Sequence, residues 1–269
     1  TLKDMHEYFR DRTPTEKNQY TGMFQGKNLL LFTGEAFWIG AVNEQYTPTL
    51  YKLAHSGFVF ENFYNPLWYY STVDGEYAAT TGLIPTNQVN ASQRYAGKNG
   101  VSMYFSMGNQ LRALGYPTLA YHNNTANYYD RNLSHPNLGY DFYACDTGLD
   151  VAMTWPQSDL EMMQLTLPQA LAGEKPFHNY YMTVSGHMNY SFAGNAMSAK
   201  HRDEVADLDM SEAARAYLAC NMELDQALEY TIKTLEEAGE LENTVIVLSG
   251  DHYPYGLDGT GAIDELAGE

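Results

Sequence analysis

The amino-acid sequence predicts an α/β fold, in which helices flank a doubly wound and mainly parallel sheet. Its apolar runs are continuous rather than alternating, which is typical of strands that are buried on both faces. Segments of helical periodicity, with recognisable start and stop signals, separate these runs. A repeated order of strand, helix and strand over 269 residues therefore indicates a sheet of the doubly wound type.

The predicted strands are five short apolar runs. They are NLLLFT (28–33), GFVFENF (57–63), PTLAYH (117–122), NYYMTVSG (179–186) and TVIVLSG (244–250). Three segments have helical periodicity and end at or next to a glycine, namely 48–57, 102–115 and 211–238. The first of them has Thr47 as an expected cap and Pro48 at the first helical position. The stretch 146–163 lacks such a pattern and is predicted to be a surface excursion.

The composition excludes several classes of partner. With 33 Asp and Glu against 15 Lys and Arg, the formal net charge of −18 argues against nucleic acid and gives no attraction to an anionic bilayer. A phosphate substrate would need a few local cations or a metal ion. Cys145 and Cys220 lie far apart and are expected to form either one disulfide or two buried thiols. No apolar run reaches the about 18 residues of a membrane span, and no signal peptide is recognisable.

Carboxylates and an imidazole directly follow two of the predicted strands. Asp251 and His252 come after 244–250, and Glu35 comes after 28–33 and Gly34. Because reactive groups gather at the carboxyl ends of parallel strands, these side chains are expected to share one crevice and to suit a divalent metal. Taken singly, each has an ordinary alternative, which is a turn that begins at Asp251 and an acid at a helix start for Glu35.

The stretch NPLWYYSTVDGEYAATTGLIP (65–85) places Thr72 just ahead of Asp74 and Glu76. As a helix cap, Thr72 would form a loose capping box with Glu76, and this interpretation is favoured when the segment is read alone. As a nucleophile, Thr72 would present its hydroxyl at a helix N-terminus, where backbone N–H groups favour phosphate, and a metal ion would activate it.

Two histidines and one arginine follow other strands. His122 ends the run 117–122, His187 follows 179–186, and Arg131 lies in the loop after His122. An arginine binds phosphate in a bidentate fork. A solvated loop position is the ordinary alternative for any one of these residues. Their coincidence with the groups at the other strand ends predicts a metal-centred phosphate or sulfate site.

Four motifs together resemble a known family. They are PTLYKLAHSGFVFENFYN, STVDGEYAATTGLIP, SGHMNYSF and NTVIVLSGDHYPYG. The chain resembles the sulfatase-like branch of the alkaline-phosphatase superfamily, and most of all the lipoteichoic acid synthases, which are membrane-anchored phosphoglycerol transferases. The similarity runs from about Lys27 to Gly256. It implies a lead-in segment at 1–26 and a catalytic domain at 27–269 that lacks the C-terminal subdomain of the family.

The resemblance implies a role for each candidate residue. Thr72 corresponds to the nucleophile of the family. One divalent ion, typically Mn²⁺, with Mg²⁺ or Zn²⁺ as alternatives, would be held by Glu35, Thr72, Asp251 and His252. The substrate head group would be held by His122, Tyr129, Arg131 and His187.

The sequence departs from the family pattern at several positions. Tyr129 stands where tryptophan is usual, and Ser71 replaces a frequently basic residue and is a rival nucleophile. Thr183 stands where two-metal phosphatases of the superfamily carry an aspartate, so a second metal is not expected. No Cys-x-Pro-x-Arg motif is present, which argues against a formylglycine sulfatase.

The implied activity is transfer of a glycerophosphoryl group from a phosphatidylglycerol-type lipid to an acceptor hydroxyl, such as that of a polyglycerolphosphate chain. The family acts on the outer face of the bacterial cell membrane, held there by an anchor that is absent from this sequence. One alternative is a phosphodiesterase, phosphatase or phosphoethanolamine transferase of the same superfamily. The other is a non-catalytic domain that binds polyanions or glycans.

Overall fold

The computed structural model describes residues 1–65, 67–87 and 92–268, and it confirms the predicted fold class. Its sheet has five parallel strands in the order β3-β2-β4-β1-β5. In chain order the strands are β1 (Asn28–Gly34), β2 (Thr118–His122), β3 (Asp141–Ala144), β4 (His178–Met182) and β5 (Thr244–Gly250). The strand order doubles back at β1 and β4, which is the arrangement that opens a crevice at the carboxyl ends.

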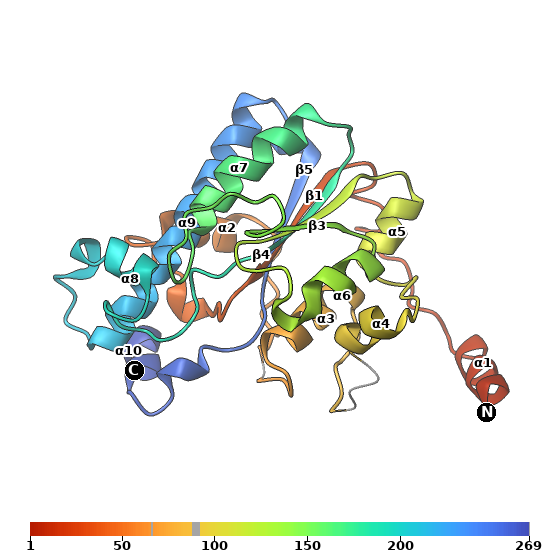
Figure 1. Ribbon diagram of the computed structural model, residues 1–269, viewed down its shortest axis with the longest axis horizontal. Coiled ribbons are helices and arrows are strands. Elements are labelled where there is room, and N and C mark those ends of the chain that lie inside the picture. The colour runs from red at the N-terminus through yellow and green to blue at the C-terminus, as the bar shows by residue number, and fades with distance from the viewer. Residues whose placement is uncertain (66, 88–91, 269) are drawn as a thin grey trace.

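Helices cover both faces of this sheet (Figure 1). The helices are α1 (Leu2–Arg10), α2 (Pro48–Ser56), α3 (Thr72–Thr81), α4 (Gln93–Asn99), α5 (Met107–Ala113), α6 (Arg131–Asn137), α7 (Asp159–Ala172), α8 (Ala196–Lys200), α9 (Glu212–Glu237) and α10 (Ala262–Ala267). On one face α2, α7 and α9 pack against Leu30 and Phe32 of β1. On the other face Leu31 packs against residues of α3 and α4. Alternate residues of a strand point to opposite faces, so both faces of β1 are buried.

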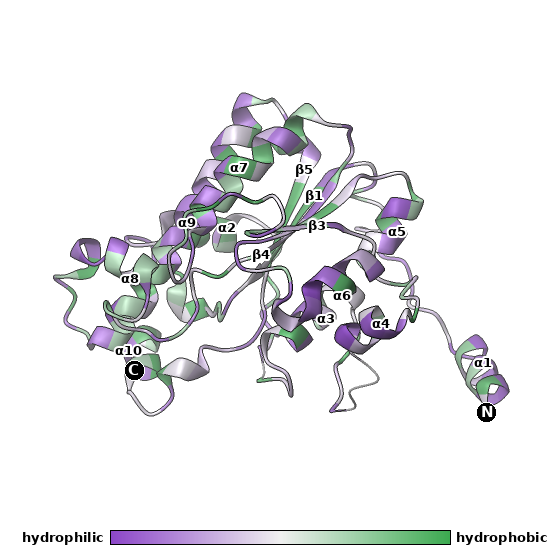
Figure 2. Ribbon diagram, in the orientation of Figure 1, coloured by the Kyte–Doolittle hydropathy of each residue, from purple (hydrophilic) through white to green (hydrophobic). Residues whose placement is uncertain are grey.

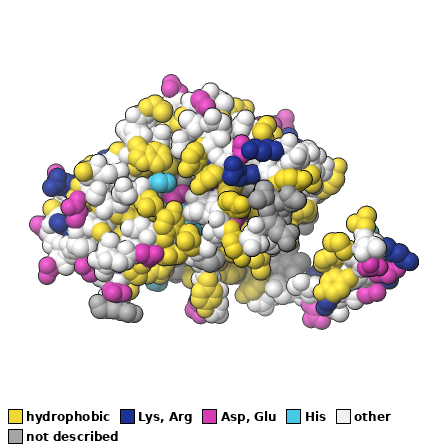
Figure 3. Space-filling model, turned by 60° about the horizontal axis from the view of Figure 1, so that its bottom comes forward, with side chains coloured by type: hydrophobic (Ala, Val, Ile, Leu, Met, Phe, Trp, Pro, Cys, Tyr) yellow, Lys and Arg dark blue, Asp and Glu magenta, His cyan; other side chains and the backbone are white. Residues whose placement is uncertain are grey.

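The distribution of hydropathy agrees with two buried interfaces. Figure 2 shows hydrophobic residues along the central strands and hydrophilic residues on the outer surfaces of α7 and α9. Acidic side chains lie around the periphery of the face drawn in Figure 3, where basic side chains gather in a few separate places. Both cysteines are free thiols, and Cys220 is buried in α9. Within the described part of the chain, no helix combines the length and apolar character needed to cross a membrane.

One predicted strand is wrong. Residues 57–63 form no strand but an irregular segment between α2 and α3, in which the side chains of Phe58 and Phe60 are 57% and 77% exposed. The apolar run satisfied the pattern of a buried strand although it lies on the surface. The edge strand β3 was missed for the converse reason. It has only four residues, two of them exposed, and it begins with Asp141, so it offers no long apolar run.

The helix predictions were largely confirmed. Helices α2 and α9 match 48–57 and 211–238, and α5 begins five residues after the start of the predicted 102–115 segment. The predicted surface excursion at 146–163 is wrong at Leu149 and Val151, which are buried in the core, and in its second half. Ser158 caps α7, and Met162 and Met163 are fully buried in the core below it.

Candidate active site

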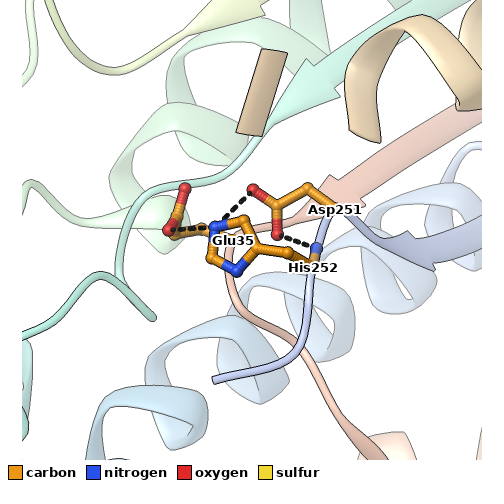
Figure 4. A group of neighbouring side chains, drawn as sticks. All are labelled: Glu35, Asp251 and His252. Carbon is orange, nitrogen blue, oxygen red and sulfur yellow. Dashed lines mark hydrogen bonds and ion pairs between the residues drawn. The ribbon is translucent and has the colours of Figure 1, made fainter. Parts of the chain in front are cut away.

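Glu35, Asp251 and His252 meet at the carboxyl ends of the neighbouring strands β1 and β5 (Figure 4). The imidazole Nε2 of His252 lies 3.4 Å from Glu35 Oε1 and 3.4 Å from Asp251 Oδ2. One ligand atom from each residue lies within 4.8 Å of the others, and all three side chains are buried. The structure therefore brings together three of the four predicted metal ligands around one point.

Backbone contacts aim these ligand atoms at one another. Asp251 Oδ1 accepts hydrogen bonds from the backbone N–H groups of Ala36 and His252, both at 2.8 Å. Its other oxygen, Oδ2, is buried without a hydrogen-bond partner among the described residues. His252 Nδ1 lies 2.9 Å from the carbonyl oxygen of Tyr253 and donates to it, which leaves Nε2 as a ligand. A buried carboxylate oxygen without a hydrogen-bond partner, facing the Nε2 of His252, fits a bound cation.

The electrostatics of the cluster also favour a cation. Burial, reinforced by the charge of Glu35, raises the pKa of Asp251 well above its ordinary value. Burial opposes protonation of His252, but the Glu35 and Asp251 carboxylates outweigh it and raise the pKa of the imidazole to about 9. The raised pKa values of Asp251 and His252 mean that positive charge is favoured at this point. A divalent ion would supply that charge in place of protons, and an O, O, N ligand set suits Mn²⁺, Mg²⁺ or Zn²⁺.

Thr72 is the fourth predicted ligand and begins α3. Its Oγ1 lies 3.3 Å from Glu35 Oε2 and 3.4 Å from His252 Nε2. The helix reaches the cluster because Gly75 has no side chain, since a Cβ there would lie 2.3 Å from the carbonyl oxygen of Asp251. Trp68 reinforces this contact by donating from Nε1 to the same oxygen at 3.1 Å. The structure thus places the threonine hydroxyl against the metal-ligand cluster.

The interpretation of Thr72 as a helix cap is wrong. The N-cap of α3 is Ser71, which has a left-handed φ of 47° and forms no capping hydrogen bond with its side chain. Asp74, rather than Glu76, closes the turn by accepting from the backbone N–H of Tyr70 at 2.9 Å. Ser71 adopts this positive φ immediately before the helix, and Thr72 is the first helical residue, with its hydroxyl at the cluster. Ser71 Oγ is buried without a hydrogen-bond partner among the described residues, whereas Thr72 Oγ1 contacts both Glu35 and His252, which favours Thr72 over Ser71 as the nucleophile.

Backbone strain is concentrated at this site. In the part of the chain that the structure describes, the non-glycine residues with positive φ are Ala36, Ser71, Tyr129 and Asp130. Ala36 follows Glu35, Ser71 precedes Thr72, and the remaining two immediately precede Arg131. Such conformations cost about 1–3 kcal/mol each and persist where surrounding structure enforces them. Their positions indicate that the fold holds these side chains in place for a purpose other than stability.

The two predicted head-group histidines extend from adjacent strands. His122 ends β2, is 4% exposed, and lies with Nδ1 3.0 Å from the carbonyl oxygen of Met182. Burial and the nearby Arg131 charge lower the pKa of His122 well below its ordinary value, so the ring is neutral. Its Nδ1–H donates to Met182, and Nε2 is left as an acceptor. His187 follows β4, is only partly buried, and packs edge-on against Trp155 at 4.9 Å.

Tyr129 and Arg131 form the remaining side of the site. Tyr129 lies in a short 3₁₀ turn, η3 (Tyr128–Asp130), and its ring faces the Arg131 guanidinium at 5.3 Å. Arg131 is 1% exposed, and its Nε donates to Glu76 Oε1 at 3.0 Å. Burial opposes the charged form of Arg131, but the carboxylates of Glu76 and, to a smaller extent, Glu35 raise the pKa of the guanidinium above its ordinary value. Arg131 therefore lies within electrostatic reach of the metal-ligand cluster.

The sequence analysis missed the role of Glu76, which it assigned to a capping box. The useful signal was its spacing, because Glu76 follows Thr72 by four residues and so lies on the same face of a helix. The assembled site combines carboxylate and imidazole ligands, a hydroxyl at a helix N-terminus, two histidines and a buried arginine. Such an arrangement can bind a phosphate or sulfate ester and transfer it to the hydroxyl.

Comparisons with known proteins agree with this chemistry. The sequence model of a family described as Sulfatase matches residues 27–266. The chain is 23% identical over 241 residues to lipoteichoic acid synthase-like YvgJ of Bacillus subtilis, with 86% of this chain and 38% of that protein covered. It is 24% identical over 284 residues to lipoteichoic acid synthase 1 of the same organism, with 100% of this chain and 43% of that protein covered. The chain thus spans about two fifths of the length of these relatives.

A solved structure supports the fold independently. The crystal structure of the lipoteichoic acid synthase LtaP from Listeria monocytogenes matches with a TM-score of 0.74. The two chains are 22% identical, and the match covers 93% of this chain and 62% of that one. At this level of identity the likeness concerns the arrangement of the sheet and helices.

Proposed function

Because the chain belongs to the sulfatase family, we propose that it is a metal-dependent phosphoglycerol transferase of the alkaline-phosphatase superfamily. One observation carries the proposal, which is the position of Thr72 Oγ1 beside both Glu35 and His252 in a buried cluster, where Asp251 Oδ2 has no hydrogen-bond partner among the described residues. The names of the relatives as lipoteichoic acid synthases support phosphoglycerol as the transferred group.

Glu35, Thr72, Asp251 and His252 would hold one divalent ion, for which we propose Mn²⁺. When bound, such an ion lowers the pKa of a coordinated hydroxyl and neutralises charge on phosphoryl oxygens. Thr183 occupies the position at which a second metal would need a carboxylate. Its hydroxyl instead accepts a hydrogen bond from the backbone N–H of Glu35 at 3.0 Å, which supports a single-metal site.

In the first half-reaction Thr72 Oγ1 attacks the phosphorus of a phosphatidylglycerol-type lipid. The bond between phosphorus and the diacylglycerol oxygen breaks, and the Thr72 hydroxyl proton passes to solvent. Arg131 binds the non-bridging oxygens, where negative charge develops. His187 is the proposed proton donor to the leaving oxygen, because it is partly exposed, whereas His122 is buried and neutral. Free diacylglycerol and a glycerophosphoryl group on Thr72 result.

In the second half-reaction an acceptor hydroxyl, such as that of a polyglycerolphosphate chain, attacks the same phosphorus. The acceptor hydroxyl gives its proton to His187, which restores the donor used in the first half-reaction. The bond between phosphorus and Thr72 Oγ1 breaks, and Thr72 regains a proton from solvent. His122 Nε2, which is free to accept a hydrogen bond, and the ring of Tyr129 are proposed to bind the glycerol part. The proposed partners are therefore a phospholipid head group and a polyol or polyglycerolphosphate acceptor.

We further propose that residues 27–269 belong to the catalytic domain and that 1–26 lead into it, since α1 contains no buried residue. The proposed location is the outer face of the bacterial cell membrane, which is where both proposed substrates would be found.

The test is substitution of the nucleophile in the full-length protein. Thr72→Ala should abolish release of diacylglycerol from fluorescent phosphatidylglycerol, whereas Ser71→Ala should retain it. Persistent release by Thr72→Ala would show that the nucleophile is another residue. The products separate transfer from the alternatives, because free phosphoglycerol indicates hydrolysis and a lengthened acceptor indicates transfer. Turnover of phosphatidylethanolamine in preference to phosphatidylglycerol would indicate a phosphoethanolamine transferase.

A further inference from the structure

A buried carboxylate outside the metal-ligand cluster holds the arginine of the site. Glu76 and Arg131 have exposed fractions of 0% and 1%. The Nε and Nη2 atoms of Arg131 both donate to Glu76 Oε1, with the first at 3.0 Å. These two hydrogen bonds to the same Glu76 oxygen fix both the position and the plane of the Arg131 guanidinium. Nη1 is held less firmly, with the carbonyl oxygen of Tyr128 at 3.4 Å.

The second oxygen of Glu76 faces neutral groups. Gln93 Nε2 donates to Oε2 at 3.2 Å, and His135 Nε2 lies 3.5 Å from it. Burial and the charge of Arg131 lower the pKa of His135 to about 3, so its ring carries no charge at neutral pH. Arg131 is therefore the charged partner of Glu76, and its two hydrogen bonds occupy the Oε1 atom of the carboxylate.

Glu76 also fixes this arginine relative to the nucleophile. Residues four apart in a helix lie on the same face with Cβ atoms about 5–6 Å apart, so Thr72 and Glu76 form such a pair in α3. The helix itself is seated on Asp251 through Gly75, where no side chain fits. One rigid helix thus sets the position of the hydroxyl, and through Glu76 that of the guanidinium, relative to the metal ligands.

We propose that Glu76 is a positioning residue. It holds the Arg131 guanidinium where it can bind the phosphoryl group of the substrate in the orientation needed for attack by Thr72. The inference rests on the proposed phosphoryl transfer. Stability alone gives little reason for this pair, because buried ion pairs are often neutral for stability compared with apolar side chains of similar volume. Its effect is directional, since misplacing a reacting group by about 1 Å costs about 100-fold in rate.

The test uses Glu76→Gln in the full-length protein, with turnover of fluorescent phosphatidylglycerol as the readout. The new amide should fit, because Gln93 Oε1 is buried without a hydrogen-bond partner among the described residues and can accept from it. We expect kcat to fall by at least about tenfold, with KM changed less than about threefold, because a guanidinium without its counter-charge still binds the phosphate but in a poor orientation.

Glu223→Gln is the matched control. Glu223 is also fully buried and pairs with Lys200 and His201, both at 2.7 Å, in a cluster that contains none of the proposed site residues. We expect its kcat to remain within about twofold of wild type at 25 °C, because this buried carboxylate lies in a cluster separate from the proposed site. An equal fall of kcat in both variants would overturn the proposal.

A double-mutant cycle with Arg131→Gln separates positioning from general structural damage. If Glu76 acts through Arg131, then adding Glu76→Gln to Arg131→Gln should change kcat by less than about threefold, because the residues act as a unit. Multiplicative losses would overturn the proposal. Loss of activity in Arg131→Gln, with wild-type kcat in a folded Glu76→Gln, would refute the positioning role and leave the transferase proposal intact. Absence of phosphatidylglycerol turnover by the wild-type protein would instead refute the transferase proposal.

Discussion

The close approach of α3 to Asp251 makes Gly75→Ala the most informative single substitution. A Cβ at this position would lie 2.3 Å from the carbonyl oxygen and 2.6 Å from the Cα of Asp251. Non-bonded carbon atoms prefer separations of about 3.5–4.0 Å, so the helix or the strand end must move by about 1 Å. Both neighbours are backbone, and no side-chain rotation relieves the contact. The displacement must therefore separate Thr72 from Asp251 and its fellow ligands.

The consequence should be large for the rate and small for stability. A shift of about 1 Å between reacting groups costs about 100-fold in kcat, or about 2.7 kcal/mol in the free energy of the transition state. Overpacking costs about 1–3 kcal/mol of folding free energy, but alanine is better than glycine in a helix by about 1 kcal/mol. The net loss of about 0–2 kcal/mol corresponds to a fall in Tm of at most about 8 °C.

The assay compares phosphatidylglycerol turnover and thermal denaturation of the full-length variant with those of wild type. Gly57→Ala is the control, because an added Cβ there meets only the Leu53 carbonyl oxygen, at an ordinary 3.7 Å. It should leave kcat unchanged. The reasoning would be refuted if folded Gly75→Ala retained the wild-type kcat, because the seating of α3 on Asp251 would then not set the position of Thr72.

The remaining predictions concern the metal and the pH dependence of stability. Mn²⁺ at 100 times its Kd should raise the free energy of unfolding by about 2.7 kcal/mol. In Asp251→Asn this stabilisation should be lost, and an unchanged rise in Tm would place the ion elsewhere. Burial opposes ionisation of Glu223, but His201, Lys200 and Ser158 outweigh it and lower its pKa from 4.5 to about 2. A depressed carboxyl pKa stabilises the fold above the unfolded value, so about 3 kcal/mol should be lost as the pH falls from about 4.5 toward 2. Glu223→Gln should lack this part of the acid transition when unfolding is followed by denaturant titration at several pH values, and an unaltered transition would contradict the assignment.

Much of the fold was predictable because a buried parallel strand requires a continuous apolar run. The strands β1, β2, β4 and β5 satisfied that requirement. The pattern failed where exposure and hydrophobicity disagree. Phe58 and Phe60 are apolar yet exposed in an irregular segment, and β3 is a strand with an exposed Asp141 at its start. Single-sequence patterns report residue type, whereas burial depends on which other segment covers a surface.

The candidate site was predictable to the extent that strand ends coincide in space. Glu35, Asp251 and His252 converge because β1 and β5 are hydrogen-bonded in register up to Gly34 and Gly250. The close contact of Gly75 with Asp251 and the ion pair between Glu76 and Arg131 were not predicted. Both depend on how α3 packs against the end of β5 and against α6. The sequence pattern assigned Glu76 to a capping box instead.

A covalent intermediate on Thr72 is the central claim, and mass spectrometry tests it most directly. The full-length protein would be mixed with Mn²⁺ and phosphatidylglycerol without an acceptor, quenched in acid and digested. Fragmentation of the peptide that contains Ser71 and Thr72 should place a glycerophosphoryl group on the Thr72 hydroxyl, and Thr72→Ala should yield no adduct. An adduct on Ser71, or continued diacylglycerol release with no adduct on either residue, would contradict the account.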